Sequence, residues 1–154
     1  MFKTICPSIK ANEEIESIAR NYTKKLLEGL EYVGILAVEY FVAGSEVIFN
    51  EYAPRVHNSG HGSIEGINCS QFENHLRACL GLDLGDTSSK AYSLMYNLLG
   101  TKGDKQAIDK MPNATYHWYE KDKVVDKRKV GHVTFTFDSR EELEKTQNLV
   151  DLVK

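Results

Sequence analysis

Two glutamates in neighbouring apolar runs are the first residues of this chain that could do chemistry. Glu39 lies in the run ILAVEYFV and Glu51 in the run VIFNEYAP, with a Gly-Ser pair between the two runs. A carboxylate inside a buried strand costs free energy unless it is paired or binds a metal. Two carboxylates on adjacent strands are typical of a site that holds Mg²⁺ through hard oxygen ligands. The alternative is that one glutamate faces solvent on an edge strand, and the spacing alone leaves both open.

The register of this expected hairpin decides whether the two carboxylates meet. A three-residue loop over residues 44–46 would place Glu39 opposite Glu51 and Phe41 opposite Phe49, whereas a two-residue loop would put the glutamates on opposite faces. Directly opposed carboxylates repel each other on a sheet unless a cation lies between them. We therefore expect the three-residue loop and a divalent-cation site.

A polar loop follows the second glutamate directly. The segment APRVHNSGH contains Arg55, His57, Asn58 and Ser59. Arginine offers a planar fork to carboxylates and phosphates, and histidine and asparagine add directional hydrogen bonds. The histidine pair of this segment could suggest zinc, but the nearby proline and glycines argue against the helix that such a pair would need. On composition alone, a solvated loop without a role is the plain alternative.

Length and composition restrict the class of protein. The chain has 154 residues, of which 42% are hydrophobic and 27% charged, as in one small globular domain or one with an appendage. A net charge of −3 gives no sign of nucleic-acid binding, and no apolar run reaches the ~20 residues of a membrane span. Cys6, Cys69 and Cys79 lack CxxC spacing, which favours free thiols in a cytoplasmic protein over a disulfide framework or a zinc site.

The elements that must position the hairpin can be read from the spacing of apolar residues. Residues 2–9 are typical of a strand, although the sequence reveals no neighbour for it. Residues 12–30 show helical spacing with Asn12 as the N-cap, and residues 70–80 form a second expected helix capped by Ser70.

Short strands and turns are expected after residue 86. Residues 91–100, 114–121 and 129–137 have strand-like patterns, the last with alternate residues facing solvent. Residues 139–153 predict an amphipathic helix. The fold class expected is α+β, with a division between residues 1–86 and 87–154.

A family resemblance is carried by the segment EYFVAGSEVIFNEYAPRVHNSGHGSIEGINCSQFENHLRACLGLDLG. It resembles the carboxy-terminal half of the 5-(carboxyamino)imidazole ribonucleotide synthases, the ATPase subunits of phosphoribosylaminoimidazole carboxylase. The family pattern joins a glutamate strand, an asparagine–glutamate pair, an APRxHNSGH loop and an SQFExHLRA helix. The chain matches it at Glu39, Asn50, Glu51 and residues 53–61 and 70–78.

The resemblance implies a fold and an activity. Residues 1–86 would form part of the second ATP-grasp subdomain, an antiparallel sheet with helices, and residues 87–154 a small β-rich carboxy-terminal domain. The family members are ligases of purine biosynthesis that use ATP to carboxylate 5-aminoimidazole ribonucleotide with bicarbonate, through carboxyphosphate.

The resemblance also implies roles for the matched residues. Glu39 and Glu51 would hold Mg²⁺ against the ATP phosphates, and Asn50 would belong to the same nucleotide site. The loop residues would face bicarbonate, carboxyphosphate and the aminoimidazole substrate: Arg55 and His57 as catalytic residues, Asn58 and Ser59 as substrate-binding residues.

Two motifs near the carboxy terminus extend the resemblance. YEK and RKVGH correspond to the family's Tyr-Gly-Lys and Arg-Lys-x-Gly-His, which implies a catalytic role for Lys121 and ribose-phosphate binding by Arg128 and Lys129. Composition alone favours a solvated hairpin tip for this basic segment. Two departures put the loop's shape in doubt, because Glu120 replaces a glycine and residues 126–127 replace small residues.

The family's amino-terminal half has no counterpart in the ten residues before the first expected helix. That half contains the first ATP-grasp subdomain, which grips the nucleotide. Three hypotheses follow. The chain is one half of a ligase that a missing amino-terminal half completes, or it is an inert remnant that could dimerise through open strand edges. In the third hypothesis it is a module that binds Mg²⁺ or a phosphorylated nucleotide-like compound. The chain alone is expected to show no ligase activity, and neither nucleic acid nor membrane is an expected partner.

Overall fold

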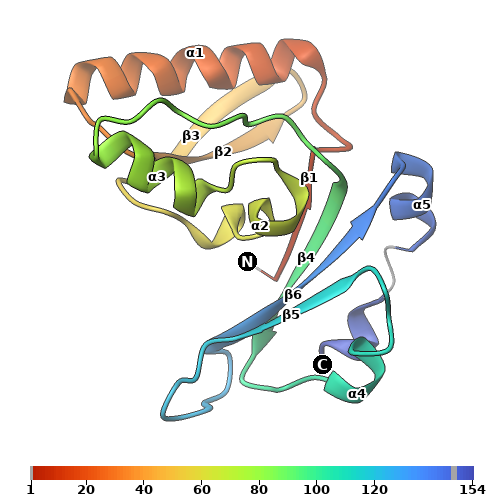
Figure 1. The fold of residues 1–154 in the computed structure, drawn as a ribbon. Coiled ribbons are helices and arrows are strands. Elements are labelled where there is room, and N and C mark those ends of the chain that lie inside the picture. Colours follow the sequence, from red (N-terminus) through yellow and green to blue (C-terminus); the bar gives the residue numbers. More distant parts are fainter. Residues whose placement is uncertain (1, 147–148) are drawn as a thin grey trace.

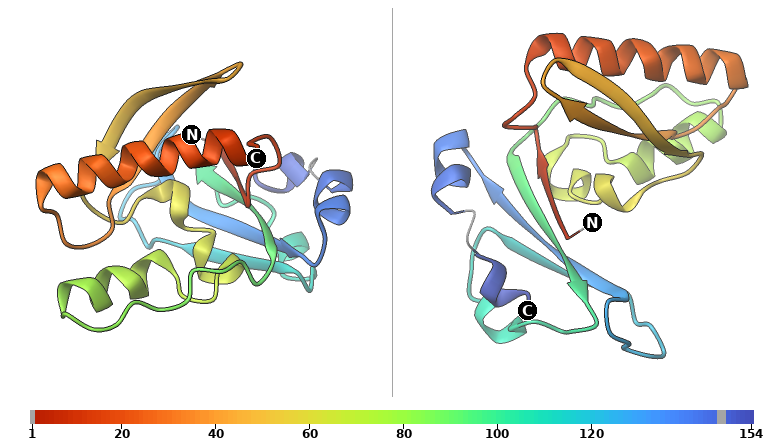
Figure 2. Two further views of the ribbon diagram at one scale, coloured as in Figure 1. Left: turned by 90° about the horizontal axis from the view of Figure 1, so that it is seen from above. Right: turned by 180° about the vertical axis from the view of Figure 1, so that it is seen from behind.

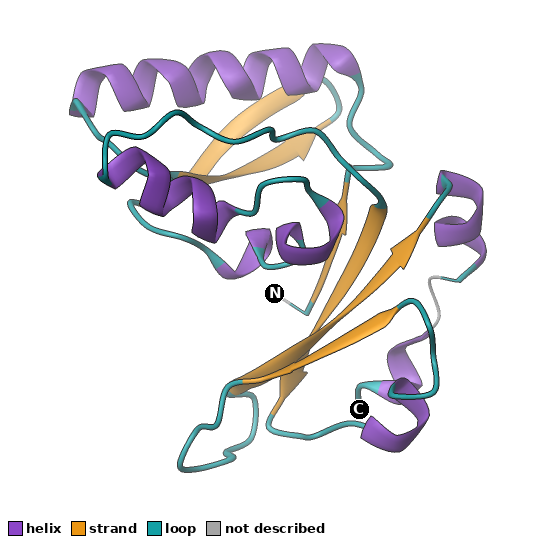
Figure 3. Cartoon of the chain, viewed as in Figure 1, coloured by secondary structure: helices purple, strands orange, loops and turns teal. Residues whose placement is uncertain are grey.

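The chain folds into a helix-covered hairpin and a four-stranded sheet (Figure 1). This computed structural model describes residues 2–146 and 149–154. The elements in chain order are β1 (Lys3–Cys6), α1 (Glu13–Leu30), β2 (Ala37–Ala43), β3 (Glu46–Ala53), η1 (Asn58–Gly60), α2 (Ser63–Gly66), α3 (Gln71–Cys79), β4 (Tyr92–Leu99), α4 (Lys105–Ile108), β5 (Ala114–Trp118), β6 (Lys129–Phe137), α5 (Arg140–Lys145) and η2 (Leu149–Leu152). Helices and antiparallel strands mix along the chain (Figure 3), so the predicted α+β class is confirmed.

Helix α1 forms where the sequence predicts it. The side chain of Asn12 accepts a hydrogen bond from the Ile15 backbone N–H at 2.9 Å, which satisfies one of the free donors of the first turn. The helix lies over the β2–β3 hairpin, where Thr23 Oγ1 and Tyr40 Oη are 2.9 Å apart. The N-cap of α3 is also confirmed, because Ser70 Oγ accepts from the Glu73 backbone N–H.

The hairpin places Glu39 opposite Glu51, as predicted, but by a different route. Its turn contains only residues 44–45, so Phe41 pairs with Ile48 and not with the following phenylalanine. The predicted three-residue loop is therefore wrong. A two-residue turn followed by an unbroken ladder would have put the two glutamates on opposite faces.

A β-bulge restores the facing of the glutamates. Tyr40 pairs with Phe49 while Glu39 pairs with Glu51, and the register shifts between these pairs. Asn50 is the extra residue on β3. A bulge adds one residue to one strand, which moves the glutamate that follows it back to the face of its partner.

The hairpin strands are less buried than the sequence indicates. Phe41 is 61% exposed, the side chain of Glu39 is 34% exposed, and Glu51 is exposed. The expectation of buried strands is wrong because the sheet has two strands and α1 covers only one of its faces (Figure 2). Burial therefore does not explain why two carboxylates face each other here. The explanation must come from the residues around them.

The second sheet holds the hydrophobic core. Its order is β1-β4-β6-β5, with every neighbouring pair antiparallel. Strand β1 thus has a neighbour in this chain, because Cys6 pairs with Ser93 and Lys3 with Tyr96. Apolar side chains of β4, β6 and the short helices form one buried cluster: Leu94, Tyr96, Leu98, Ile108, Val130, Val133, Phe135, Phe137, Leu143 and Val153.

Strand β6 is buried on both faces, which corrects the predicted alternation. Thr134 is fully buried, whereas the alternating pattern predicts that it faces solvent. Helix α2 contacts β4 and β6, and so does α5. Figures 1 and 2 show α2 on one side of this sheet and α4, α5 and η2 on the other.

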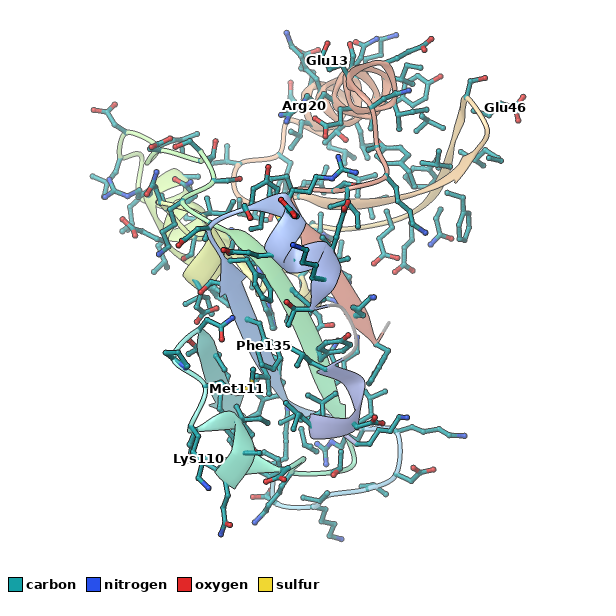
Figure 4. All side chains as sticks on the ribbon, turned by 90° about the vertical axis from the view of Figure 1, so that its right-hand side faces the viewer. Glu13, Arg20, Glu46, Lys110, Met111 and Phe135 are labelled. Carbon is teal, nitrogen blue, oxygen red and sulfur yellow. The ribbon has the colours of Figure 1, made fainter. Side chains whose placement is uncertain are left out.

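The helix predicted over residues 139–153 is shorter. Ser139 caps α5 as expected, with its Oγ accepting from the Glu142 backbone N–H, but the helix ends at Lys145 and a separate 3-10 turn, η2, follows. Residues 147–148 lie outside the described part. Figure 4 shows α5 and η2 beside the sheet that carries Phe135, with Glu46 at the distant hairpin tip. In the described ranges, no helix has the length and apolar character to cross a membrane.

Candidate active site

Glu39 and Glu51 lie on the face of the hairpin that points away from α1. Tyr40 contacts Thr23 of α1, and consecutive residues of a strand point to opposite faces. The bulge brings Asn50 to this site as well, because its Nδ2 lies 3.4 Å from Glu39 Oε2. The adjacent carboxylates and amide come from one short segment of each strand.

His57 completes a cluster with the two carboxylates. One ligand atom each of Glu39, Glu51 and His57 lies within 4.8 Å of the others, and His57 Nδ1 is 3.6 Å from Glu39 Oε1. The same nitrogen lies 2.8 Å from Ser59 Oγ, so it already has a hydrogen-bond partner. The carboxylate oxygens suit a hard divalent cation such as Mg²⁺, and the donor set therefore fits the predicted metal.

Helix α3 fixes the loop that carries His57. Gln71 Oε1 accepts from the His57 backbone N–H at 3.0 Å and Gln71 Nε2 donates to the His57 carbonyl at 2.8 Å. Gln71 Nε2 also lies 3.0 Å from His61 Nδ1. A Cβ on Gly60 would lie 2.6 Å from Gln71 Oε1, so a larger residue there would displace the side chain that holds the loop.

Asn58 joins the loop to the four-stranded sheet. Its Nδ2 donates to Asn97 Oδ1 and Asn97 Nδ2 donates to Asn58 Oδ1, both at 2.8 Å. Asn97 is fully buried on β4. Arg55, by contrast, is exposed, and its Nη1 donates to the Val56 carbonyl at 2.9 Å. Of the predicted loop residues, His57 lies beside the glutamate pair with Ser59 on its ring nitrogen, whereas Asn58 is held against β4 and Arg55 is open to solvent.

The basic residues near the carboxy terminus are not brought to the glutamates. Lys121 and Arg128 are exposed in the β5–β6 loop, which Figures 1 and 2 show at the far end of the sheet from the hairpin. Among the described residues, no hydrogen bond or ion pair joins Lys121 to either glutamate. Lys129 begins β6 and is half-buried, and its charge is a minor cause of the lowered pKa of His61, after burial and the charges of His57 and His117. The roles predicted for these residues, for the two glutamates with Asn50 and for the loop at residues 55–59 stay predictions.

Both departures from the family pattern coincide with strained backbone. Glu120 has a φ of +49° and Lys127 a φ of +59°. This left-handed region suits glycine and disfavours residues with a Cβ. The structure therefore gives a reason for the family's glycine at the position of Glu120.

Sequence reasoning missed a buried polar cluster behind the loop. His117 Nε2 lies 2.7 Å from Glu65 Oε1, and Tyr119 Oη lies 2.7 Å from His132 Nδ1. His117 and His132 pair across β5 and β6, and their rings stack with centroids 4.3 Å apart. The sequence offers one signal for this cluster, which is the presence of histidines in strand patterns that are otherwise apolar.

Burial controls the ionisation of this cluster. It lowers the pKa of His132 to about 3, with smaller contributions from the charges of His117 and His61. Burial also raises the pKa of Tyr119 to about 12 and is the main cause of the lowered pKa of His61. Burial disfavours the charged form of each group, so all three are neutral at pH 7.

Two family models match the chain. Residues 2–72 match the ATP-grasp domain, and residues 93–146 match the phosphoribosylaminoimidazole carboxylase C-terminal domain. The first match contains the glutamate pair and its loop. The second contains β4, β5 and β6. The predicted division at residues 86 and 87 falls between the two matches and stays a prediction.

Curated relatives and solved structures agree with these matches. The N5-carboxyaminoimidazole ribonucleotide synthase of Saccharolobus solfataricus is 42% identical over 92% of this chain, which spans 38% of that protein. The synthetase structure from Thermus thermophilus is 46% identical with a TM-score of 0.93, covering 99% of this chain and 42% of that one.

A third relative was solved with ligands. The synthase from Aspergillus clavatus, in complex with ADP and 5-aminoimidazole ribonucleotide, is 31% identical with a TM-score of 0.88. The match covers 99% of this chain and 43% of that one. Motifs, domain matches and fold agree over nearly the whole chain: it belongs to the N5-carboxyaminoimidazole ribonucleotide synthase family of ATP-grasp proteins and corresponds to about two fifths of its relatives' length.

Proposed function

We propose that the chain forms part of an ATP-dependent ligase that carboxylates 5-aminoimidazole ribonucleotide with bicarbonate, by way of carboxyphosphate. The observation that carries this proposal is the facing of Glu39 and Glu51 beside an intact APRVHNSGH loop. An Aspergillus clavatus relative that binds ADP and 5-aminoimidazole ribonucleotide has the same fold, which supports the substrate class.

Glu39 and Glu51 would hold Mg²⁺, which supplies positive charge to the ATP phosphates. Phosphoryl transfer depends mainly on groups positioned around developing negative charge. The amide of Asn50 lies against the Glu39 carboxylate at 3.4 Å and orients it. The bulge thereby sets both the position of Glu51 and the orientation of its partner.

Arg55 and His57 would act on bicarbonate and carboxyphosphate. A bicarbonate oxygen attacks the γ-phosphorus of ATP with ADP leaving, and the substrate amine then attacks the carboxyphosphate carbon with phosphate leaving. The exposed guanidinium of Arg55 can bind the anion. The imidazole of His57, held through its backbone by Gln71, can donate or accept a hydrogen bond there.

Asn58 and Ser59 would bind the substrate, with Lys121, Arg128 and Lys129 as further contacts. Asn58 and Ser59 have fixed partners in Asn97 and His57. Lys121 and Arg128 would reach the substrate from the β5–β6 loop, whose positive charge suits a ribose phosphate.

The rest of the site would come from the part of the relatives that this chain does not match. The chain spans 38% of the Saccharolobus solfataricus relative, and Glu51 and Arg55 of the proposed site are exposed in this structure. We propose that a segment equivalent to the relatives' remaining length completes the pocket, in the same or another polypeptide. We also propose a cytoplasmic location, which the free thiols of Cys6, Cys69 and Cys79 favour.

Complementation tests this function. The chain would be fused behind the unmatched amino-terminal part of the Thermus thermophilus relative, and phosphate release from ATP would be measured with bicarbonate and 5-aminoimidazole ribonucleotide. We expect turnover by the fusion, none by the 154-residue chain, and none by a fusion carrying Glu39→Gln and Glu51→Gln.

Each failure has its own meaning. A fold-competent fusion without turnover would contradict the proposal and favour the inert remnant. Turnover by the isolated chain would contradict the need for a completing segment. Titration calorimetry of the chain with Mg²⁺ and the ribonucleotide separates an inert remnant from a module that only binds.

A further inference from the structure

A chain of polar side chains, in which His132 is buried and the other three are half-buried, lies behind the substrate loop and crosses between the two family matches. Glu65 comes from α2, His117 from β5, Tyr119 from the residue after β5, and His132 from β6. Glu65 Oε1 is 2.7 Å from His117 Nε2, and Tyr119 Oη is 2.7 Å from His132 Nδ1. The residues of this buried chain have no assigned role in the proposed reaction.

Two atoms of the buried chain lack a protein partner. Glu65 Oε2 and His132 Nε2 are inaccessible to solvent and make no hydrogen bond within the described ranges. His132 as a whole is 2% exposed. A carboxylate oxygen can only accept a hydrogen bond, whereas the ring nitrogen can donate one if it carries the proton. The two unpaired atoms can therefore serve as donor and acceptor when His132 carries its proton on Nε2.

The tautomer of His132 follows from its other nitrogen. The depressed pKa keeps the ring neutral at pH 7, so it carries a single proton. If that proton were on Nδ1, Nε2 would present a lone pair toward the Glu65 carboxylate and both groups would be acceptors. If Tyr119 donates its hydroxyl proton to Nδ1, the ring proton lies on Nε2 and can be donated toward Glu65.

A shared metal ion is the alternative use of these atoms, and the ring geometry argues against it. Glu65, His117 and His132 each offer a ligand atom within 4.8 Å of the others. The two imidazole rings are stacked, however, with 17° between their planes. The lone pair of a ring nitrogen lies in the ring plane, so near-parallel stacked rings do not point two lone pairs at one ion.

We infer that Tyr119, His132, Glu65 and His117 form one continuous hydrogen-bonded chain that positions Asn58 of the substrate loop. One water would bridge His132 Nε2–H and the Glu65 carboxylate, because both atoms are buried without a protein partner and a water can accept from one and donate to the other. A hydrogen bond with the side chain of Asn58 partly offsets the effect of burial on the pKa of Tyr119, and Asn97 holds that side chain through two further hydrogen bonds.

Tyr119 and His132 are therefore positioning residues. Their effect on substrate rests on the proposed function, since it acts through Asn58. The arrangement of protons within the buried chain does not depend on that function, and it can be measured without ATP or substrate.

Nitrogen-15 NMR of the histidine rings in the 154-residue chain tests the inference. We expect His132 to stay neutral as the Nε2–H tautomer between about pH 5 and pH 8. Tyr119→Phe should convert His132 to a mixture of tautomers and raise amide exchange at Asn58 about fivefold, the factor that one hydrogen bond is worth. Glu65→Gln should also shift the tautomer balance, because it removes the anionic acceptor.

Tyr116→Phe is the matched control. Tyr116 lies on β5 next to His117, and its hydroxyl donates to the Lys102 carbonyl at 3.0 Å, outside the buried chain. This variant should leave the His132 tautomer and the Asn58 exchange rate unchanged.

Three results would overturn the inference. They are an Nδ1–H tautomer of His132 in the unmodified protein, a Tyr119→Phe variant that behaves like Tyr116→Phe, and stoichiometric Zn²⁺ that shifts the His117 and His132 resonances. If the fusion lacks ligase activity while the Nε2–H tautomer is found, the proposed function fails and the hydrogen-bonded chain stands. If the fusion is active and His132 carries its proton on Nδ1, the hydrogen-bonded chain fails and the proposed function stands.

Discussion

Single residues behind the loop illustrate how one physical cause shifts an acid and a base in opposite directions. Burial lowers the pKa of His132 and raises that of Tyr119, because in each case it disfavours the charged form. Both groups therefore remain neutral at pH 7. The Tyr119 hydroxyl and the His132 imidazole can then form their hydrogen bond without burying a charge.

The lowered pKa of His132 predicts acid sensitivity. A base whose pKa is lower in the folded than in the unfolded protein stabilises the fold above its ordinary pKa of about 6.5. That contribution is lost as the pH falls from about 6.5 towards about 3, at up to about 1.4 kcal/mol per pH unit. His117, His61 and Glu65 face the same ring and change the slope. Urea unfolding of the unmodified chain and of His132→Gln at pH 7 and pH 5.5 measures it, and equal losses in the two proteins would contradict the assignment.

The backbone strain at Glu120 predicts a stabilising substitution. Glu120→Gly removes the Cβ from a residue with a φ of +49°, and should raise the free energy of unfolding by about 0.5–1 kcal/mol. Asp122→Gly, in the same exposed loop but without a positive φ, should lower it instead, since glycine there only adds freedom to the unfolded chain. Urea denaturation distinguishes the two signs, and a loss of stability in both variants would refute the strain.

At the scale of elements, the bulge in β3 decides whether a cation site can exist. The two-residue turn and the extra residue at Asn50 each change the register by one, and together they return Glu51 to the face of Glu39. Neither feature alone would give the pair. The site thus depends on an irregularity of the backbone as much as on the carboxylates.

Inserting an alanine between Asn50 and Glu51 should therefore separate the glutamates. The insertion would move Glu51 by one position along the strand onto the α1 face, so Mg²⁺-dependent turnover of the fusion protein should fall by at least about a hundredfold. Asn50→Ala keeps the register and loses only the contact to Glu39 Oε2 at 3.4 Å, so its loss should stay within about fivefold. Equal losses in the two variants would show that the facing of the glutamates does not decide turnover.

The sequence predicts local features of the fold better than distant ones. The helix N-caps at Asn12 and Ser70 follow from the chemistry of a side chain and the next turn. The bulge does not, because it leaves no mark in a pattern of alternating residues, and the predicted facing of Glu39 and Glu51 is right for a wrong reason. The buried cluster at Glu65 could not be predicted either, since its members meet only through packing of α2 on the sheet.

At the scale of the whole molecule, the hairpin presents an apolar face beside the glutamates. Phe41 and its cross-strand partner Ile48 lie on this face and are 61% and 46% exposed, and β2 and β3 form a sheet with two open edges. Exposed apolar surface and unpaired edges favour association with another chain. This is the surface on which we propose that the completing segment lies.

The isolated chain should associate with itself through this face. We expect its apparent mass to rise with concentration in light scattering, and Phe41→Lys to suppress that rise. Val125→Lys is the control, because Val125 is similarly exposed at 52% but lies in the β5–β6 loop. A chain that stays monomeric at all concentrations, or equal effects of the two substitutions, would contradict a role for the hairpin face.

The pairing of β1 with β4 delays completion of the four-stranded sheet during synthesis. Cys6 and Ser93 are neighbours in the sheet although 87 residues separate them in the chain. At a synthesis rate of about 5–20 residues per second, β1 waits roughly 4 to 17 s for its partner. During this delay the nascent ATP-grasp portion has an unprotected strand, so the ribosome-bound protein is a natural client for a chaperone until β4 emerges.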